Sequence, residues 1–303
     1  MGAQLRLVRR RIGTVQSIAK ITRAQELIAS SRIVRAQQQM RAAEPYAREL
    51  TRAVEAVISR STNITHPFTT EPVSPARAAV LVLTSDQGFA GAYNANVLRE
   101  SARLRELLRE RGVQPVLYVA GRKGVAWHRF RELELARSWT GFSATPRYSD
   151  AKAISDVLLE AFSAEEADDH VDEIHLVGTE FVSMLTQRPA VRRLLPLEIE
   201  ETEEPSPHGP LPAYEFEPGP AEVLDALMPQ YVASRIYYAL LEAAAAELAA
   251  RRRAMKAATD NANDLLETLT REANNARQAE ITQEISEIVG GANALAEASA
   301  TSE

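Results

Sequence analysis

The sequence predicts an α/β protein with a long antiparallel coiled coil: two terminal helices form a shaft, and an open α/β domain lies between them. Residues 1–60 contain, after Gly2, only one glycine and one proline. Between Pro229 and Gly290 there is neither. Residues 76–200 instead contain short β-branched runs separated by glycine turns. Internal Gly and Pro destabilise helices, whereas short β-branched runs favour strands, so the ends are predicted to be helical and the middle mixed.

Residues 1–60 are predicted to form one helix with two rows of contact positions. Small or apolar residues recur in steps of three and four, which is typical of a buried line along a helix. This line, the N-terminal seam, consists of Leu5, Val8, Ile12, Val15, Ala19 and Thr22. A second row beside it consists of Ile18, Ile21, Gln25 and Ile28. One neighbour needs one row, so the second row indicates contacts on another side, as with another chain.

Residues 222–290 are predicted to form the second helix, because they are rich in the strong helix formers Ala, Leu, Glu and Arg. About sixty unbroken residues give a rod of roughly 90 Å, which needs a partner along its length. The first helix is the natural candidate. Gly290 and Gly291 are expected to stop the second helix, leaving residues 291–303 as a tail.

The seam of the second helix is thin. Its members are Ile236, Leu240, Ala243, Glu247, Leu265, Leu269, Ile281, Ile285 and Ile288. Between them lie the small residues 244–246 and the polar run 259–264. Alanine lets helices approach closely, and polar residues inside a coiled coil can specify its register. The pattern fits a solvated helix face equally well, so both interpretations stay open.

The central region, residues 76–200, is predicted to be a Rossmann-like domain with an open, mostly parallel sheet, because strand patterns alternate with helix patterns. A helix is expected at 150–162, capped by Ser149. Residues 201–221, rich in proline and acids, are expected to form a linker or an extended arm. Buried strands are expected at 78–84, 113–120 and 174–178.

Two glycine turns follow the expected strands: Gly88-Phe89-Ala90-Gly91 and Gly121-Arg122-Lys123-Gly124. Each resembles a phosphate-binding turn, but neither has the spacing of a GxGxxG or Walker motif. Glycine in such turns more often serves tight strand-to-helix geometry, which is the favoured interpretation. Asp86 has no second carboxylate or histidine at a fixed offset, so we expect a cap or turn role. No catalytic, cofactor-binding or metal-binding residues are predicted.

Composition excludes several kinds of chemistry. The chain has no cysteine, which removes disulfides and thiolate catalysis, and its five histidines lack ligand spacing. The net charge of −6 hides an asymmetry: residues 1–41 carry nine basic side chains and one acid, whereas residues 160–222 carry sixteen acids and three arginines. The basic end fits nucleic acid, a transit peptide or an acidic protein surface, and composition does not choose among them.

Three stretches of the sequence carry a family resemblance. The first is IGTVQSIAKITRA at residues 12–24, together with the stretch from Arg41 to Ala47. The second is TSDQGFAGAYN at residues 84–94. The third and most specific is AMKAATDNA at 254–262 followed by NARQAEITQEI at 275–285. Together they resemble the gamma subunit of F-type, proton-translocating ATP synthases of the bacterial type, over essentially the whole chain.

The resemblance implies a rotor and not a catalyst, without a cofactor. The end helices would turn inside a ring of alpha and beta subunits, and the α/β domain would contact the epsilon subunit and the membrane c-ring. Proton flow would turn the shaft and drive the beta catalytic sites through their conformations. No nucleic-acid partner and no direct membrane insertion are expected. Two alternatives stay open: a nucleotide-binding α/β enzyme with helical arms, and a coiled-coil nucleic-acid-binding protein.

The resemblance also implies roles for individual positions. Contacts with the beta subunit are expected at Lys20, Arg23, Gln25, Arg277, Gln278 and Thr282. Contacts on the c-ring and epsilon side are expected at Phe216 and Glu217. Without cysteine the chain lacks the regulatory thiol pair of chloroplast relatives. The acidic run at 165–169 is hypothesised to contact a neighbouring rotor part; a deletion that leaves ATP synthesis and proton pumping unchanged would contradict this. The expected location is the cytoplasmic face of a bacterial plasma membrane.

Overall fold

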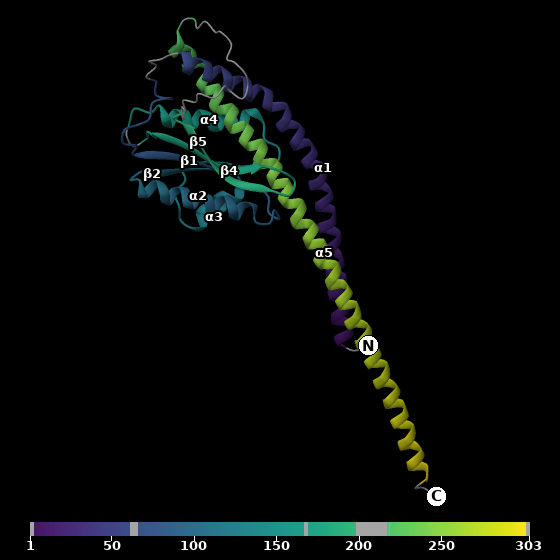
Figure 1. Ribbon diagram of the computed structural model, residues 1–303. Coiled ribbons are helices and arrows are strands. Elements are labelled where there is room, and N and C mark those ends of the chain that lie inside the picture. The colour runs from purple at the N-terminus through teal and green to yellow at the C-terminus, as the bar shows by residue number, and fades with distance from the viewer. Residues whose placement is uncertain (1–2, 61–65, 167–168, 198–216, 218, 301–303) are drawn as a thin grey trace. The chain divides into compact units, whose positions relative to one another are not determined.

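The computed structural model describes residues 3–60, 66–166, 169–197, 217 and 219–300. The chain divides into two units. One consists of Ala29–Arg252, and the other combines Met1–Ile28 with Arg253–Glu303. Helices α1 (Ala3–Arg60) and α5 (Pro220–Ala300) each contribute to both units (Figure 1).

The larger unit contains a five-stranded sheet in the order β3-β2-β1-β4-β5. Its strands are β1 (Arg77–Leu83), β2 (Gln114–Ala120), β3 (Arg137–Trp139), β4 (Glu173–Phe181) and β5 (Gln187–Leu195). The first four are parallel, and β5 pairs antiparallel with β4 at the edge. The predicted Rossmann-like, mostly parallel sheet is confirmed.

Each face of the sheet has its own hydrophobic core. On one face α2 (Tyr93–Glu110) and α3 (Arg122–Phe130) pack on Ala78, Val80 and Val82 of β1. On the other face Ala79, Leu81 and Leu83 pack on α4 (Tyr148–Phe162) and on parts of α1 and α5 (Figure 1). Because both faces are covered, β1 is an almost continuous apolar run and not an alternating one.

The three predicted strands are found, but β3 and β5 were not predicted. Strand β5 contains Pro189 and three arginines, which obscure a strand pattern. Proline is tolerated there because an edge strand leaves one row of amides unpaired. The predicted cap at Ser149 was wrong: α4 begins at Tyr148, and the Asp150 carboxylate accepts a hydrogen bond from the Arg147 amide at 2.8 Å.

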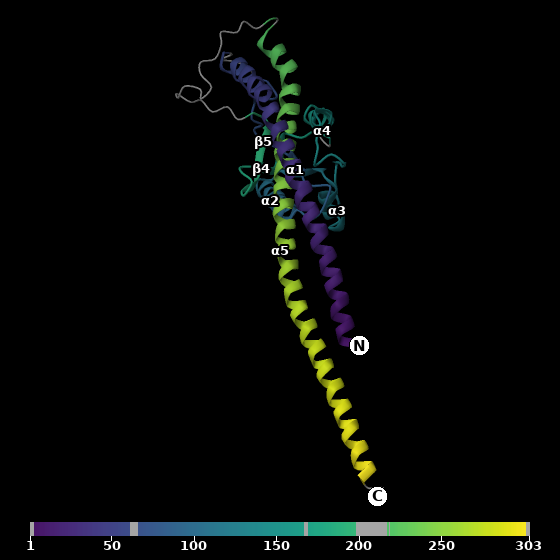
Figure 2. The ribbon, with the colours of Figure 1, turned by 90° about the vertical axis from the view of Figure 1, so that its right-hand side faces the viewer.

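Within the larger unit, α1 and α5 pack antiparallel. Ile33 and Ala36, near the start of the part of α1 in this unit, pack on residues 245–249, near the end of the part of α5 in this unit. Later in α1, Val54 shares a core with Leu224, near the start of α5. Figures 1 and 2 show the two helices side by side from two directions. The predicted coiled coil is therefore present.

Within the smaller unit, the N-terminal seam faces α5. Leu5, Val8 and Thr22 are buried, and the other three seam residues are partly buried. The second row remains exposed, with Ile21 at 62%. One helix row thus has its partner in this chain, and the other faces solvent.

The predicted stop at Gly290 and Gly291 was wrong, because α5 continues through both glycines to Ala300. Neither glycine has a positive φ, so neither adopts the left-handed conformation that ends a helix. Glycine alone lowers helix stability by only about 1 kcal/mol, which a long helix can absorb. Leu265 and the predicted seam residues after Leu269 are exposed: Ile281, Ile285 and Ile288.

Candidate functional site

The predicted beta-subunit contacts lie in two zones of the smaller unit. Lys20, Arg23 and Gln25 are exposed on α1, where Arg23 forms an ion pair with Glu26 at 3.2 Å. Thr22 in this segment forms a hydrogen bond with Thr259 of α5. The first zone therefore lies beside the part of α5 around Thr259.

The second zone lies on α5 beyond Thr259. Arg277, Gln278 and Thr282 are exposed, and the Thr282 hydroxyl donates to the Gln278 carbonyl oxygen at 2.9 Å. Arg277 is eighteen residues beyond Thr259, a separation of about 27 Å along the helix. The structure therefore keeps the two predicted contact zones apart. Phe216 lies outside the described residues, and Glu217 is exposed.

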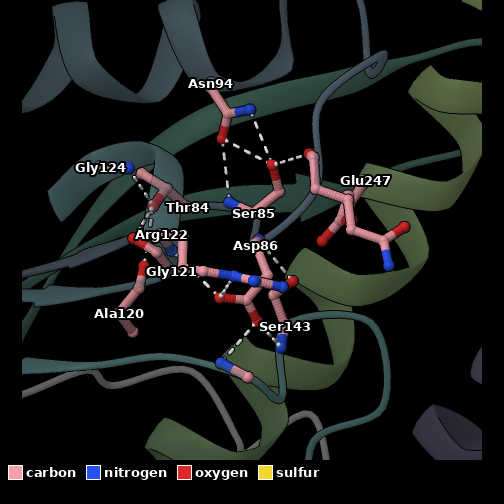
Figure 3. Close-up of polar contacts among 12 residues, drawn as sticks. Thr84, Ser85, Asp86, Asn94, Ala120, Gly121, Arg122, Gly124, Ser143 and Glu247 are labelled. Carbon is pink, nitrogen blue, oxygen red and sulfur yellow. Dashed lines mark hydrogen bonds and ion pairs between the residues drawn. The ribbon is translucent and has the colours of Figure 1, made fainter. Parts of the chain in front are cut away.

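A polar junction in the larger unit joins the carboxyl end of β1 to the following helices (Figure 3). The Thr84 hydroxyl donates to the Ala120 carbonyl oxygen at 2.8 Å and accepts from the Gly124 amide at 2.9 Å. A Cβ atom at Gly121 would lie 2.2 Å from the Thr84 carbonyl oxygen, and one at Gly124 would lie 2.6 Å from the Thr84 hydroxyl. The favoured geometric role of this glycine turn is confirmed.

The turn after β1 is closed by Ser85 and Asn94. The Asn94 side-chain oxygen accepts from the Ser85 amide at 2.9 Å, and its nitrogen donates to the Ser85 hydroxyl at 2.8 Å. That hydroxyl in turn donates to the Gln87 carbonyl oxygen at 2.7 Å. These bonds replace regular backbone pairing, so the spacing from Ser85 to Asn94 has a structural reason.

Asp86 serves as a hydrogen-bond acceptor for three backbone amides. Its carboxylate accepts from Arg122 at 3.1 Å and from Gly141 and Ser143 at 2.9 Å each (Figure 3). Burial alone would raise the pKa of Asp86, but these hydrogen bonds outweigh it, so the pKa lies below its ordinary value. Asp86 caps α3 and fixes the loop after β3, as its predicted cap role implies.

Helix α5 is attached to this junction by hydrogen bonds from Arg251, whose charge is paired with Glu247 on the same helix. The Arg251 guanidinium donates to Glu247 at 2.6 Å and, at 3.3 Å, to the carbonyl oxygens of Gln87 and Gly88. Burial raises the pKa of Glu247, and Arg251 opposes that rise. Sequence reasoning missed this attachment, although a Glu in a seam with Arg four residues later, among alanines, was its signal.

The crevice where open α/β folds usually bind ligands is covered. Such ligands bind beyond the carboxyl ends of the strands where the strand order reverses, which here lies between β1 and β4. Helix α5 covers this place, because Leu240 and Ala243 share one core with residues of β1 and β4. The cavity that remains beside Thr84, at the ends of β1 and β2, is about 10 Å³. That volume suits at most one water molecule. Among the residues that the structure describes, no acidic, His or Cys cluster is arranged to hold a metal ion.

Comparison with known proteins decides the family. A family model described as ATP synthase matches residues 4–295. The ATP synthase gamma chain of Acidothermus cellulolyticus is 63% identical over 97% of this chain and 98% of its own length. This chain belongs to the ATP synthase gamma family. The gamma chain of Thermobifida fusca is 59% identical over the full length of both chains.

Solved structures share this fold at low sequence identity. A chain of the Euglena gracilis mitochondrial ATP synthase (OSCP/F1/c-ring, rotational state 3) has a TM-score of 0.68 at 15% identity, covering 97% of this chain and 95% of that one. A chain of the rotor of the same enzyme has a TM-score of 0.64 at 14% identity, covering 93% and 100%. The predicted combination of end helices and central α/β domain is thus a fold found in chains of solved ATP synthase assemblies.

Proposed function

We propose that this gamma chain is the rotor of the central stalk and couples rotation of the membrane c-ring to conformational change in the beta catalytic sites. It would supply no catalytic residue, and the complex as a whole would make ATP. The observation that supports this most strongly is the 63% identity with a gamma chain over nearly the full length of both proteins. Neighbours described as rotor and F1/c-ring assemblies support the same assignment.

Exposed apolar rows on both end helices support a surrounding partner. Ile18, Ile21 and Ile28 are each at least 46% exposed on α1. Ile285 and Ile288 are at least 56% exposed on α5. Rows of exposed apolar side chains mark interaction surfaces in soluble proteins. A ring of alpha and beta subunits around the helices would cover them.

The predicted polar contacts fit a rotor because they are shallow. Arg277, Gln278 and Thr282 present donors and acceptors on the helix surface, without a pocket of their own. A ligand shifts an equilibrium only by its differential affinity for the states involved. A rotor that bound one beta conformation very tightly would stall there, so exposed and modest contacts suit repeated stepping.

The junction between α5 and the turn after β1 would carry torque within the chain. Arg251 donates hydrogen bonds to two backbone carbonyl oxygens of that turn, and Glu247 orients the guanidinium. Buried hydrogen bonds resist sliding better than an exposed ion pair, because breaking them leaves polar groups without hydrogen-bond partners. Force applied to the α/β domain by epsilon and the c-ring would thereby reach α5.

The proposed location is the cytoplasmic face of a bacterial plasma membrane, with attachment through the c-ring. In the part of the chain that the structure describes, no helix combines the length and apolar character required to span a bilayer. Glu217 is proposed as a c-ring or epsilon contact, together with Phe216.

Co-expression with alpha and beta subunits of a 59–63% identical relative's enzyme tests the function. The expected product is a complex with one copy of this chain per three alpha and three beta subunits, whose ATP hydrolysis turns a bead fixed to the α/β domain. The matched control omits this chain. A complex that forms but never rotates the bead would contradict the proposal, as would failure to assemble.

A further inference from the structure

A groove on the larger unit lies between α2 and α3. Its volume is about 450 Å³. That value falls within the range of about 300–1,000 Å³ typical of small-molecule sites. The lining residues are Gly91, Asn94, Ala95, Leu98, Arg99, Ala102, Lys123 and Trp127. They combine two cations, an amide, an indole and an apolar floor, and none of them is acidic.

The cations of this groove are not neutralised within the described part of the chain. Arg99 and Lys123 are exposed, and their charged side-chain groups form no ion pair or hydrogen bond with any described residue. The Lys123 side chain extends over the glycine turn after β1, where its amine would lie 3.5 Å from a Cβ atom at Gly88. Two unpaired cations on one concave surface create a positive potential that attracts an anion.

A third cation behind the groove strengthens this potential. Leu98, Ala102 and Arg105 follow one face of α2, because they are four and three residues apart. Arg105 is only 6% exposed, and Nε of its guanidinium is buried without a hydrogen-bond partner among the described residues. Nε2 of His128, in α3 directly after Trp127, is likewise buried without a partner. A buried charge without a partner is costly, so the contact between α2 and α3 favours a nearby negative charge or ordered water.

Trp127 gives the groove an aromatic surface. The Arg131 guanidinium lies 4.0 Å from the centroid of one ring of the indole. Trp127 is partly exposed and contributes to the groove wall. An indole held against an arginine and open to a concave surface is a suitable stacking partner for a flat base.

We propose that the groove between α2 and α3 binds a nucleoside phosphate, with Lys123 and Arg99 on the phosphates and Trp127 against the base. The covered crevice between β1 and β4 plays no part in this site. The proposal goes beyond the rotor function and does not depend on it, because it concerns the chain itself. It assigns a ligand-binding role to Lys123, in a glycine turn whose glycines serve only geometry.

Fluorescence titration of the full-length chain tests the site. The chain has two tryptophans, so Trp139→Phe leaves Trp127 as the only tryptophan reporter. ADP is expected to change its emission saturably, and adenosine and pyrophosphate are each expected to bind more weakly than ADP. Lys123→Ala and Arg99→Ala should each raise the dissociation constant about tenfold, the value of one charge-assisted hydrogen bond. Arg103→Ala, an exposed arginine of α2 outside the groove, is the matched control and should leave it unchanged.

Three results would overturn the proposal. The first is no saturable change at millimolar ADP, confirmed by calorimetry on the unsubstituted chain. The second is an Arg103→Ala effect as large as that of Lys123→Ala, which would indicate general charge attraction. The third is equal affinity for pyrophosphate and ADP, which would show that the nucleoside contributes nothing to binding. The measurement uses no partner subunit, so its failure would leave the proposed rotor function untouched.

Discussion

The hydroxyl oxygens of Thr22 and Thr259 lie 2.7 Å apart in the buried contact between α1 and α5. Each hydroxyl is also close to a carbonyl oxygen of its own helix, Ala19 at 3.1 Å and Met255 at 2.9 Å. A hydroxyl has one proton, so only one of the two can donate to its own helix while the other donates across the interface. This pair satisfies buried polar atoms at one alignment of the helices, so it specifies their register.

Replacing either threonine by valine should loosen this contact. Thr22→Val and Thr259→Val are each expected to cost about 1 kcal/mol, because one hydrogen bond is lost and the remaining hydroxyl keeps its own helix carbonyl. The double variant should cost less than the sum, since both remove the same bond. Hydrogen exchange of amides 253–262 measures the effect. Thr268→Val, on the exposed surface of α5, is the control, and additive single effects would contradict the pairing.

Asp86→Asn should destabilise the α/β domain in a pH-dependent way. The folded state lowers the pKa of Asp86, so its stabilisation is fully present above the unfolded value of about 3.9 and disappears as pH falls through the lower folded value. At pH 7 we expect a cost of about 2 kcal/mol, typical of charge-assisted hydrogen bonds. Urea unfolding from pH 7 to pH 3 should show the two proteins converge at the acid end. Asp156→Asn, on the exposed surface of α4, is the control; a constant difference at all pH values would count against this role for Asp86.

Arg251→Met should weaken the attachment of α5 to the turn after β1. The substitution leaves Glu247 buried without its partner, and breaking such a pair costs about 3–5 kcal/mol. Adding Glu247→Gln to the same chain removes the stranded charge and should recover part of the loss. Urea unfolding measures the cost, and hydrogen exchange at Gln87 and Gly88 reports the turn. A single variant as stable as the unsubstituted chain would rule out a supporting role for Arg251.

Two glycines with opposite surroundings should respond oppositely to alanine. At Gly124 a Cβ atom would lie 2.6 Å from the Thr84 hydroxyl and 2.8 Å from a Val119 methyl, so Gly124→Ala should cost about 1–3 kcal/mol. At Gly290 nothing lies within 4 Å, so Gly290→Ala should stabilise the end of α5 by about 1 kcal/mol. Thermal unfolding measures the first change, and amide exchange around residue 290 measures the second. If Gly290→Ala lowered stability, as Gly124→Ala is expected to do, the helix would have to end at Gly290 in solution.

Alanine at the second contact zone should separate assembly function from folding. Arg277, Gln278 and Thr282 are exposed, so the triple alanine variant should leave the melting temperature of the free chain unchanged. In the assembled enzyme, ATP-driven proton pumping should fall about a hundredfold if the three contacts add, since each lost polar contact is worth about 1 kcal/mol. Gln283→Ala, on the neighbouring exposed position, is the control. Undiminished pumping by the triple variant would mean that this zone does not contact the ring.

The periodic features of the fold were predictable from the sequence. The steps of three and four from Leu5 to Thr22 correctly identified the buried line of α1, because the helical repeat decides which residues share a face. Strands β1, β2 and β4 were recognisable because burial on both faces demands continuous apolar runs. Strand β5 was not, since an edge strand can carry arginines and a proline.

The site depended on the sequence and the tertiary structure in different ways. The sequence alone determined the two helical ends and the central sheet, because these follow from local spacing. Only the tertiary structure decided that Arg251 holds the turn after β1, that Thr22 meets Thr259 and that α5 covers the crevice between β1 and β4. These contacts join residues more than 150 positions apart, and no local pattern encodes which distant side chain will occupy a given space.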